Sequence, residues 1–150
     1  MKRRVLILCT GNSARSQMAE GLLRHLAGDY LEVMSAGIAP TRVNPLAIQV
    51  MAEKGIDISQ HRSKHLDEFL HQPFDVIITV CDHAAEHCPV FPGRAQRIHW
   101  SIPDPSFVEE KKRLPAFRQA RDLLETHLTA WLAALPPEWH QGKEQTPHAT

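Results

Sequence analysis

The chain has 150 residues, three cysteines, and 17 lysines and arginines that balance 17 aspartates and glutamates. This length suits one domain with a full hydrophobic core, and the even charge balance argues against a nucleic-acid partner or a membrane-surface role. No apolar run is long enough to span a membrane, and the basic start shows no signal-peptide cleavage pattern. A small, odd number of cysteines does not suit a disulfide scaffold, so we expect a reducing, cytoplasmic setting.

Strand and helix patterns alternate along the chain. Apolar runs without alternation predict buried strands, and apolar residues at helical spacing predict amphipathic helices. In chain order we expect a strand at residues 4–8, a helix at 16–26, a strand at 31–36, a helix at 45–54, a short helix at 63–70, a strand at 74–80, a short helix at 83–87, a strand at 97–100 and a long helix at 114–135. Ser16, Asn44 and Asp82 are the expected helix caps. We expect one domain over residues 1–135 and a loose polar tail over residues 136–150.

This alternation predicts an α/β fold: a three-layer sandwich in which helices cover both faces of a four-stranded parallel sheet. Ligands in such folds bind beyond the carboxyl ends of the strands. Cys9 and Cys81 each follow the end of a predicted strand, and Asp104 follows the last strand. We therefore expect these three residues to meet at one edge of the sheet.

The first strand and first helix are joined by a C-x5-R loop, Cys9-Thr10-Gly11-Asn12-Ser13-Ala14-Arg15, followed by Ser16. Gly11 and Asn12 tolerate the left-handed backbone conformations that turn successive N–H groups inward. Such a nest at a helix N-terminus attracts anions, and Arg15 adds a two-pronged donor. These positive groups should stabilise the thiolate of Cys9 as a nucleophile. The plain alternative is a buried thiol at a strand end.

Cys81 and Cys88 flank the short helix expected after the third strand. Seven helical residues would separate their Cα atoms by about 10 Å, whereas a disulfide requires about 7 Å or less. A bond between them therefore requires the segment to unwind, which favours a redox function. Two structural thiols are an open alternative. A zinc site that also uses His83 and His87 has poor ligand spacing for a structural site.

Asp104 lies between Pro103 and Pro105, which hold it in a stiff loop at the functional edge of the sheet. A carboxylic acid that faces the leaving oxygen would be a useful proton donor. An ordinary turn aspartate explains the same residues equally well.

Taken together, the loop, Cys81, Cys88 and Asp104-Pro105 resemble the thioredoxin-coupled arsenate reductases of the low-molecular-weight protein tyrosine phosphatase superfamily, over about residues 3–134. Polar residues at positions 10 and 13 are similar to the reductases, because the phosphatases usually carry bulkier apolar residues there. The resemblance implies a low-molecular-weight phosphatase-like fold and an arsenate or phosphate oxyanion in the loop. The residues implied for oxyanion binding are Thr10, Gly11, Asn12, Ser13, Ala14 and Arg15.

The resemblance also implies a three-cysteine relay. Cys9 attacks arsenate, Asp104 protonates the departing oxygen, and Ser16 steadies the Cys9 thiolate. Cys81 then attacks the Cys9 adduct, arsenite leaves, and a Cys9–Cys81 disulfide remains. Cys88 attacks Cys81 to give a Cys81–Cys88 disulfide, which thioredoxin or glutaredoxin would reduce. No cofactor or resident metal is expected.

Two alternatives remain open. An aryl-phosphate or protein tyrosine phosphatase needs only Cys9, Arg15 and Asp104. A non-enzymatic oxyanion or redox sensor would bind a partner through the segment between the second and third cysteines, although nothing in the chain resembles a DNA-binding helix-turn-helix.

Two departures from the family pattern are visible. Ala14 stands where many relatives have a second loop cysteine, so no disulfide can form within the loop. Some relatives bind potassium near the loop; Asn12 and Glu20 match two of its ligands, but Arg62 and Lys64 stand at two others. A cation repels potassium, so we expect Lys64 or Arg62 to pair with Glu20 instead.

Overall fold

A four-stranded parallel sheet organises the protein, and the computed structural model describes residues 2–144, with the side chains of residues 2–140. The elements in chain order are β1 (Arg3–Cys9), α1 (Arg15–Ala27), β2 (Leu31–Gly37), α2 (Pro45–Ala52), η1 (Leu66–Phe69), β3 (Val76–Thr79), α3 (Asp82–Glu86), β4 (Gln96–His99), η2 (Pro105–Phe107), α4 (Glu110–Ala133) and η3 (Pro137–Glu144), where η denotes a 3₁₀ helix.

The strand order in the sheet is β2-β1-β3-β4, and every neighbouring pair is parallel. β1 is central because its run Val5–Leu8 is fully buried and can pack on both faces of the sheet. In the register, Leu6 lies opposite Met34 of β2 and Ile77 of β3. The predicted four-stranded parallel sheet is confirmed.

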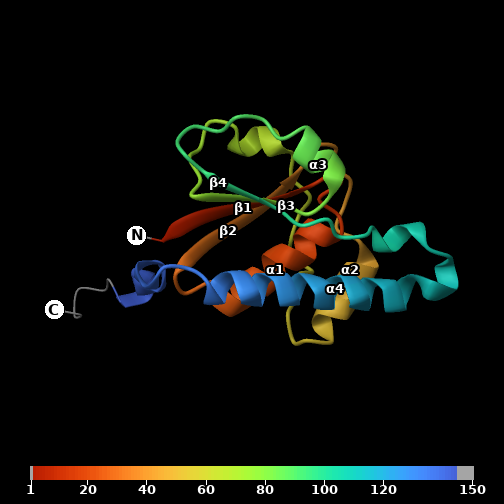
Figure 1. Cartoon of the computed structure of the whole chain (residues 1–150). Helices are drawn as coiled ribbons and strands as arrows, with labels where there is room; N and C mark the ends of the chain where they lie inside the picture. Colours follow the sequence, from red (N-terminus) through yellow and green to blue (C-terminus); the bar gives the residue numbers. More distant parts are fainter. Residues whose placement is uncertain (1, 145–150) are drawn as a thin grey trace.

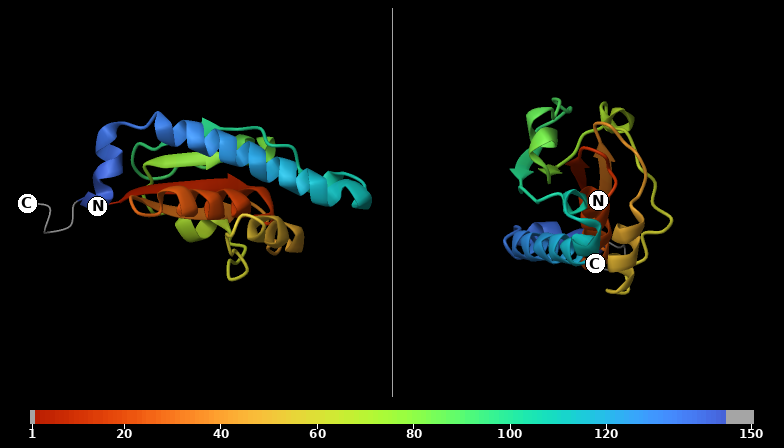
Figure 2. Two further views of the ribbon diagram at one scale, coloured as in Figure 1. Left: turned by 90° about the horizontal axis from the view of Figure 1, so that it is seen from below. Right: turned by 90° about the vertical axis from the view of Figure 1, so that its right-hand side faces the viewer.

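Helices cover both faces of this sheet (Figure 1). α1, α2 and α4 lie on one face, where α1 and α4 run side by side (Figure 2). α3 and η1 lie on the other face. Buried residues at helical spacing hold the first layer to the sheet, including Met18 and Leu22 of α1 and Phe117, Leu124 and Leu128 of α4. The predicted three-layer arrangement is confirmed.

α4 begins at Glu110, four residues before the start expected at Leu114, and Pro115 lies inside it. Pro115 does not end the helix, because a proline in an early turn costs only one backbone hydrogen bond when the flanking turns pack well. Within residues 2–144, no helix is long and apolar enough to cross a membrane.

The segment after α4 is not loose over residues 137–144, where the structure shows the 3₁₀ helix η3. Trp139 packs against the hydrophobic core, and the guanidinium carbon of Arg3 lies 4.9 Å from the centre of its ring. The prediction of a loose tail is therefore wrong for this part, because Trp139 packs on the core and contacts Arg3 of β1. Residues 145–150 lie outside the described residues.

Gly37, at the end of β2, lies directly against the C-x5-R loop. A Cβ atom here would lie 2.6 Å from the carbonyl oxygen of Thr10 and 2.8 Å from the backbone nitrogen of Asn12. These are backbone atoms, so no side chain can rotate away to make room. The sequence indicates only that this glycine ends a strand, whereas the structure shows that the loop requires it.

We expect the Gly37→Ala substitution to destabilise the protein by about 1–3 kcal/mol, because the new methyl group must displace loop backbone. Urea unfolding measures this loss. Gly11→Ala is the matched control, since a Cβ there would meet only side-chain atoms of Thr41 and Ser13 within 3.6 Å. Equal stability of the two variants would contradict the close-approach explanation.

Candidate active site

The loop between β1 and α1 surrounds a small cavity of about 170 Å³. Asn12 has a φ of +46°, and it is the only non-glycine residue with a positive φ within residues 2–144. The expected left-handed conformation is thus present at Asn12 but not at Gly11. The residues that line the cavity are Cys9, Thr10, Gly11, Ser13, Ala14, Arg15, Asn44, Asp104 and Ser106.

The N-terminus of α1 opens onto this loop. Ala14 is its N-cap and provides no side-chain hydrogen bond, so the first N–H groups of the helix have no side-chain cap. Uncapped N–H groups at a helix N-terminus bind anions. Ser16 lies inside the first turn and is not the cap that the sequence suggested. Its hydroxyl accepts a hydrogen bond from Asn12 Nδ2 at 2.8 Å, and a bond from Ser16 to Cys9 remains a prediction.

Arg15 and Asp104 lie far apart in the sequence but line the same cavity. Arg15 Nη1 donates to the carbonyl of Ile102 at 2.9 Å, and Nη2 lies 3.5 Å from Asp104 Oδ2. The other carboxylate oxygen of Asp104 accepts hydrogen bonds from the backbone N–H and the hydroxyl of Ser106, at 2.9 and 2.7 Å. Asp104 is therefore held with its Oδ2 toward Arg15, and both residues line the cavity.

Two cavity residues were missed from the sequence. Ser106 follows Asp104 by two residues, which is the spacing of an Asx turn, and that spacing was the available signal. Asn44 was recognised only as the cap of α2, a role that the structure shows through its Oδ1 and the N–H of Leu46. Its position at the cavity follows from the backbone hydrogen bond that its N–H donates to Ser13.

Cys81 lies beside Cys9 because β3 and β1 are neighbours in the sheet. Both residues are buried, and each thiol shifts the pKa of the other. Cys81 Sγ also lies 3.3 Å from Thr10 Oγ1 and accepts a hydrogen bond from the N–H of Ala84 at 3.4 Å. Cys81 is thus the N-cap of α3, in place of the expected Asp82.

The Cys9 and Cys81 thiols shift each other's pKa in opposite directions. The interaction with the Cys9 side chain lowers the pKa of Cys81 to about 5, and Thr10, the N–H of Ala84 and the charge of Arg15 add to this effect against the cost of burial. The same interaction raises the pKa of Cys9, as does burial, while Arg15 lowers it. The two thiols titrate as a pair, and a thiolate on Cys9 stays a prediction.

Cys88 is half-buried at the far end of the α3 segment, and all three cysteines are free. The helix covers only Asp82–Glu86, so it forms little more than one turn between the two thiols. The rings of His83 and His87 pack against each other at 4.3 Å. Within residues 2–144, no group of three or more histidine, cysteine or acidic side chains is placed to hold a metal ion, so the zinc interpretation gains no support.

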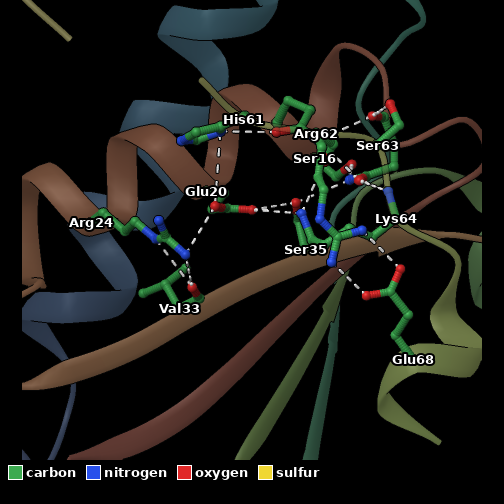
Figure 3. A network of polar contacts seen from close by, with 12 residues as sticks. Ser16, Glu20, Arg24, Val33, Ser35, His61, Arg62, Ser63, Lys64 and Glu68 are labelled. Atoms are coloured by element: carbon green, nitrogen blue, oxygen red, sulfur yellow. Dashed lines mark hydrogen bonds and ion pairs between the residues drawn. The ribbon is translucent and has the colours of Figure 1, made fainter. Parts of the chain in front are cut away.

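A buried polar network lies behind the loop, around Glu20 of α1 (Figure 3). The Glu20 carboxylate accepts a hydrogen bond from Ser35 and lies 3.1 Å from Arg24, 3.7 Å from Lys64 Nζ and 3.8 Å from His61 Nδ1. Burial lowers the pKa of both Lys64 and His61. This network places a positive charge next to the only buried carboxylate of α1.

Of the two residues expected to pair with Glu20, Lys64 does so and Arg62 does not; Arg24 of α1 is a second and nearer cation, at 3.1 Å. Arg62 turns away and forms two hydrogen bonds with Glu68, at 2.7 and 2.9 Å (Figure 3). The backbone N–H of Lys64 also donates to Asn12 Oδ1 at 2.9 Å, which ties the network to the loop. A potassium ion does not fit beside the Lys64 ammonium group, so these residues replace such an ion rather than bind it.

The fold and site together define an α/β protein with a C-x5-R oxyanion loop. The chain belongs to the low molecular weight phosphotyrosine protein phosphatase family, whose family model matches residues 4–141. This confirms the superfamily and the fold that the resemblance implied.

Several similar proteins are named arsenate reductases, and some similar solved structures are tyrosine phosphatases. The chain is 45% identical over 123 residues to the arsenate reductase of Halalkalibacterium halodurans, a match that covers 81% of this chain and 88% of that protein. The solved structure of an arsenate reductase in the phosphate binding state has a TM-score of 0.78 and 31% identity, and covers 89% of this chain and 99% of that chain. A thioredoxin-dependent arsenate reductase of Corynebacterium glutamicum has a TM-score of 0.67 and 28% identity, over 89% of this chain and 64% of that chain.

We expect the loss of Cys9 to raise the pKa of Cys81 from about 5, because its largest stabilising hydrogen bond disappears. The ultraviolet absorbance of thiolate against pH measures this in Cys9→Ala/Cys88→Ala. The matched control is Cys88→Ala alone, which keeps the pair intact. An identical titration midpoint in the two proteins would show that the pair is not coupled.

We expect hydrolysis of an aryl phosphate to be indifferent to the replacement of potassium chloride by choline chloride at equal ionic strength, because Lys64 already supplies the charge. Lys64→Ser removes that charge beside Glu20 and should lower the activity, with partial recovery in potassium. A large, saturable activation of the unaltered protein that is specific to potassium would overturn this expectation.

Proposed function

We propose that this protein is an arsenate reductase that converts arsenate to arsenite by a relay of Cys9, Cys81 and Cys88, is recycled by thioredoxin, and serves arsenic detoxification. One observation carries the proposal: a second thiol, Cys81, is buried behind the oxyanion loop, with its sulfur 3.3 Å from Thr10 Oγ1, the residue that follows Cys9. A phosphatase has no use for this thiol. The named relatives support the same activity.

In the first step, the loop N–H groups and Arg15 hold the oxyanion while the Cys9 sulfur attacks arsenic. Cys9 must first lose its proton, and the Cys81 thiolate beside it is the nearest acceptor. The transfer leaves a Cys9 thiolate and a Cys81 thiol, so one negative charge serves both residues in turn. Asp104 protonates the oxygen that leaves arsenic.

In the second step, the Cys81 thiol loses its proton to water, and its sulfur attacks the sulfur of Cys9. The electron pair of the arsenic–sulfur bond leaves with arsenic, which is reduced from arsenate to arsenite, and a Cys9–Cys81 disulfide remains. Both sulfur atoms are oxidised by one electron each, so the two-electron reduction of arsenic is balanced. The contact between these thiols in the folded protein means that this step needs little rearrangement.

In the third step, Cys88 attacks Cys81 and releases Cys9. The α3 helix must unwind for this bond to form. α3 has only five residues, and at its two ends the N–H of Ala85 donates to the carbonyl of Cys81 at 3.2 Å and the N–H of His87 to that of His83 at 3.1 Å. A helix of little more than one turn opens at low cost.

The partner that reduces the Cys81–Cys88 disulfide is proposed to be thioredoxin, in line with the thioredoxin-dependent relative. Glutaredoxin is the alternative, because the choice depends on the fit of two protein surfaces. A cytoplasmic setting, inferred from the odd number of cysteines, stays a prediction.

Phosphatase activity is the second candidate, and the family membership favours it. Phosphate and arsenate have the same shape and charge, so the loop, Arg15 and Asp104 serve both. We expect weak hydrolysis of aryl phosphates beside arsenate reduction.

Replacing Cys81 or Cys88 with serine should abolish multiple-turnover arsenate reduction with thioredoxin, because the oxidised Cys9 can no longer be recycled. Both variants should still hydrolyse p-nitrophenyl phosphate, which needs only the loop and Asp104. Cys9→Ser is the control that should lose both activities. Undiminished arsenate turnover in either resolving-cysteine variant would reject the relay, and glutaredoxin assayed in parallel identifies the preferred reductant.

A further inference from the structure

Two side chains of the edge strand β4 contact the segment from Asp82 to Pro89, which contains α3. Arg97 and His99 lie two residues apart on β4, opposite Ile77 and Thr79 of β3. Side chains two apart on a strand point to the same face, and here that face is the one that α3 covers. The segment that must unwind in the proposed relay is therefore fastened to β4 by side chains.

Arg97 holds the end of this segment that carries the resolving thiol. Its Nη1 donates to Cys88 Sγ at 2.9 Å, and its Nη2 donates to the carbonyl oxygen of Pro89 at 2.8 Å. The planar guanidinium presents both donors in a fixed geometry. The sulfur is thus fixed at the rim of a cavity of about 190 Å³ that Ile77 and Ala85 also line.

His99 holds the other end. Its Nε2 lies 2.8 Å from Asp82 Oδ1, at the first residue of α3, and its Nδ1 lies 2.8 Å from Thr79 Oγ1. This contact involves no sulfur atom. Of the two contacts with β4, only that of Arg97 involves the sulfur of Cys88.

We propose that Arg97 is a positioning residue for Cys88: it holds the reduced sulfur on β4 and releases it when Cys88 bonds to Cys81. This inference rests on the proposed relay. A guanidinium interacts more strongly with a thiol or thiolate sulfur within reach than with a disulfide sulfur drawn toward Cys81. Because the interaction differs between the two states, Arg97 stabilises the dithiol form relative to the disulfide.

The thiol–disulfide exchange in which Cys88 leaves Arg97 needs no external oxidant. The Cys88 sulfur attacks the Cys81 sulfur of the Cys9–Cys81 disulfide, and its proton passes to water. The Cys9–Cys81 bond breaks, and its electron pair leaves on Cys9, whose thiolate faces Arg15. One disulfide replaces another, and Arg97 is left without its sulfur partner.

The test is the equilibrium between dithiol and Cys81–Cys88 disulfide in dithiothreitol redox buffers. It is measured in a Cys9→Ser background, where no other disulfide can form. Arg97→Gln should shift the equilibrium constant about tenfold toward the disulfide, which is about 30 mV for a two-electron couple. Arg97→Lys, which keeps the charge but loses the fork, should shift it less. Arg94→Gln is the matched control, since Arg94 is exposed nearby and should cause no shift.

The outcomes separate this inference from the relay. A shift with Arg97→Gln but not with Arg94→Gln supports the positioning role. An unchanged midpoint with Arg97→Gln, in a protein that does form the disulfide, overturns the role of Arg97 and leaves the relay standing. Failure of the Cys9→Ser parent to form the disulfide at any buffer ratio overturns the relay and the role of Arg97 together. With Cys9 restored, unchanged hydrolysis of p-nitrophenyl phosphate by Arg97→Gln shows that the variant folds.

Discussion

The placement of the Cys9 and Cys81 thiols side by side is the constraint on which the site depends. It exists because β1 and β3 are adjacent parallel strands that end at the same edge of the sheet. Each strand is followed by a helix, α1 after β1 and α3 after β3. In the proposed relay, this placement sets the nucleophile next to the thiol that resolves it before any substrate binds.

Buried contacts on the side away from the cavity fix the conformation of the C-x5-R loop. Asn12 donates to Ser35 and accepts from the backbone of Lys64, and Gly37 leaves just enough room for the loop backbone above β2. Lys64 neutralises part of the charge of Glu20 in a setting with little water. The cavity in front therefore owes its shape to buried polar contacts that involve neither thiol.

Much of this molecule could be predicted from local patterns. The central strands β1 and β3 were foreseen because buried parallel strands are continuous apolar runs, and the loop because Cys9 and Arg15 have a spacing that suits an oxyanion. Two predictions from local patterns were wrong, one at the C-terminal segment and one at the start of α3. Trp139 found a place against the core in a stretch that is polar by composition, and Cys81 took the cap position of α3 that Asp82 was expected to fill.

The sequence by itself determined the α/β class, the oxyanion loop and the presence of three thiols at strand ends, because strand patterns, loop residues and cysteine positions are properties of short segments. Only the tertiary structure decided which thiol lies beside Cys9, which cations face Glu20 and which side chain holds Cys88. Those outcomes depend on the distances between residues far apart in the chain, such as Cys9 and Cys81, and electrostatic and hydrogen-bond energies change steeply over a few ångströms.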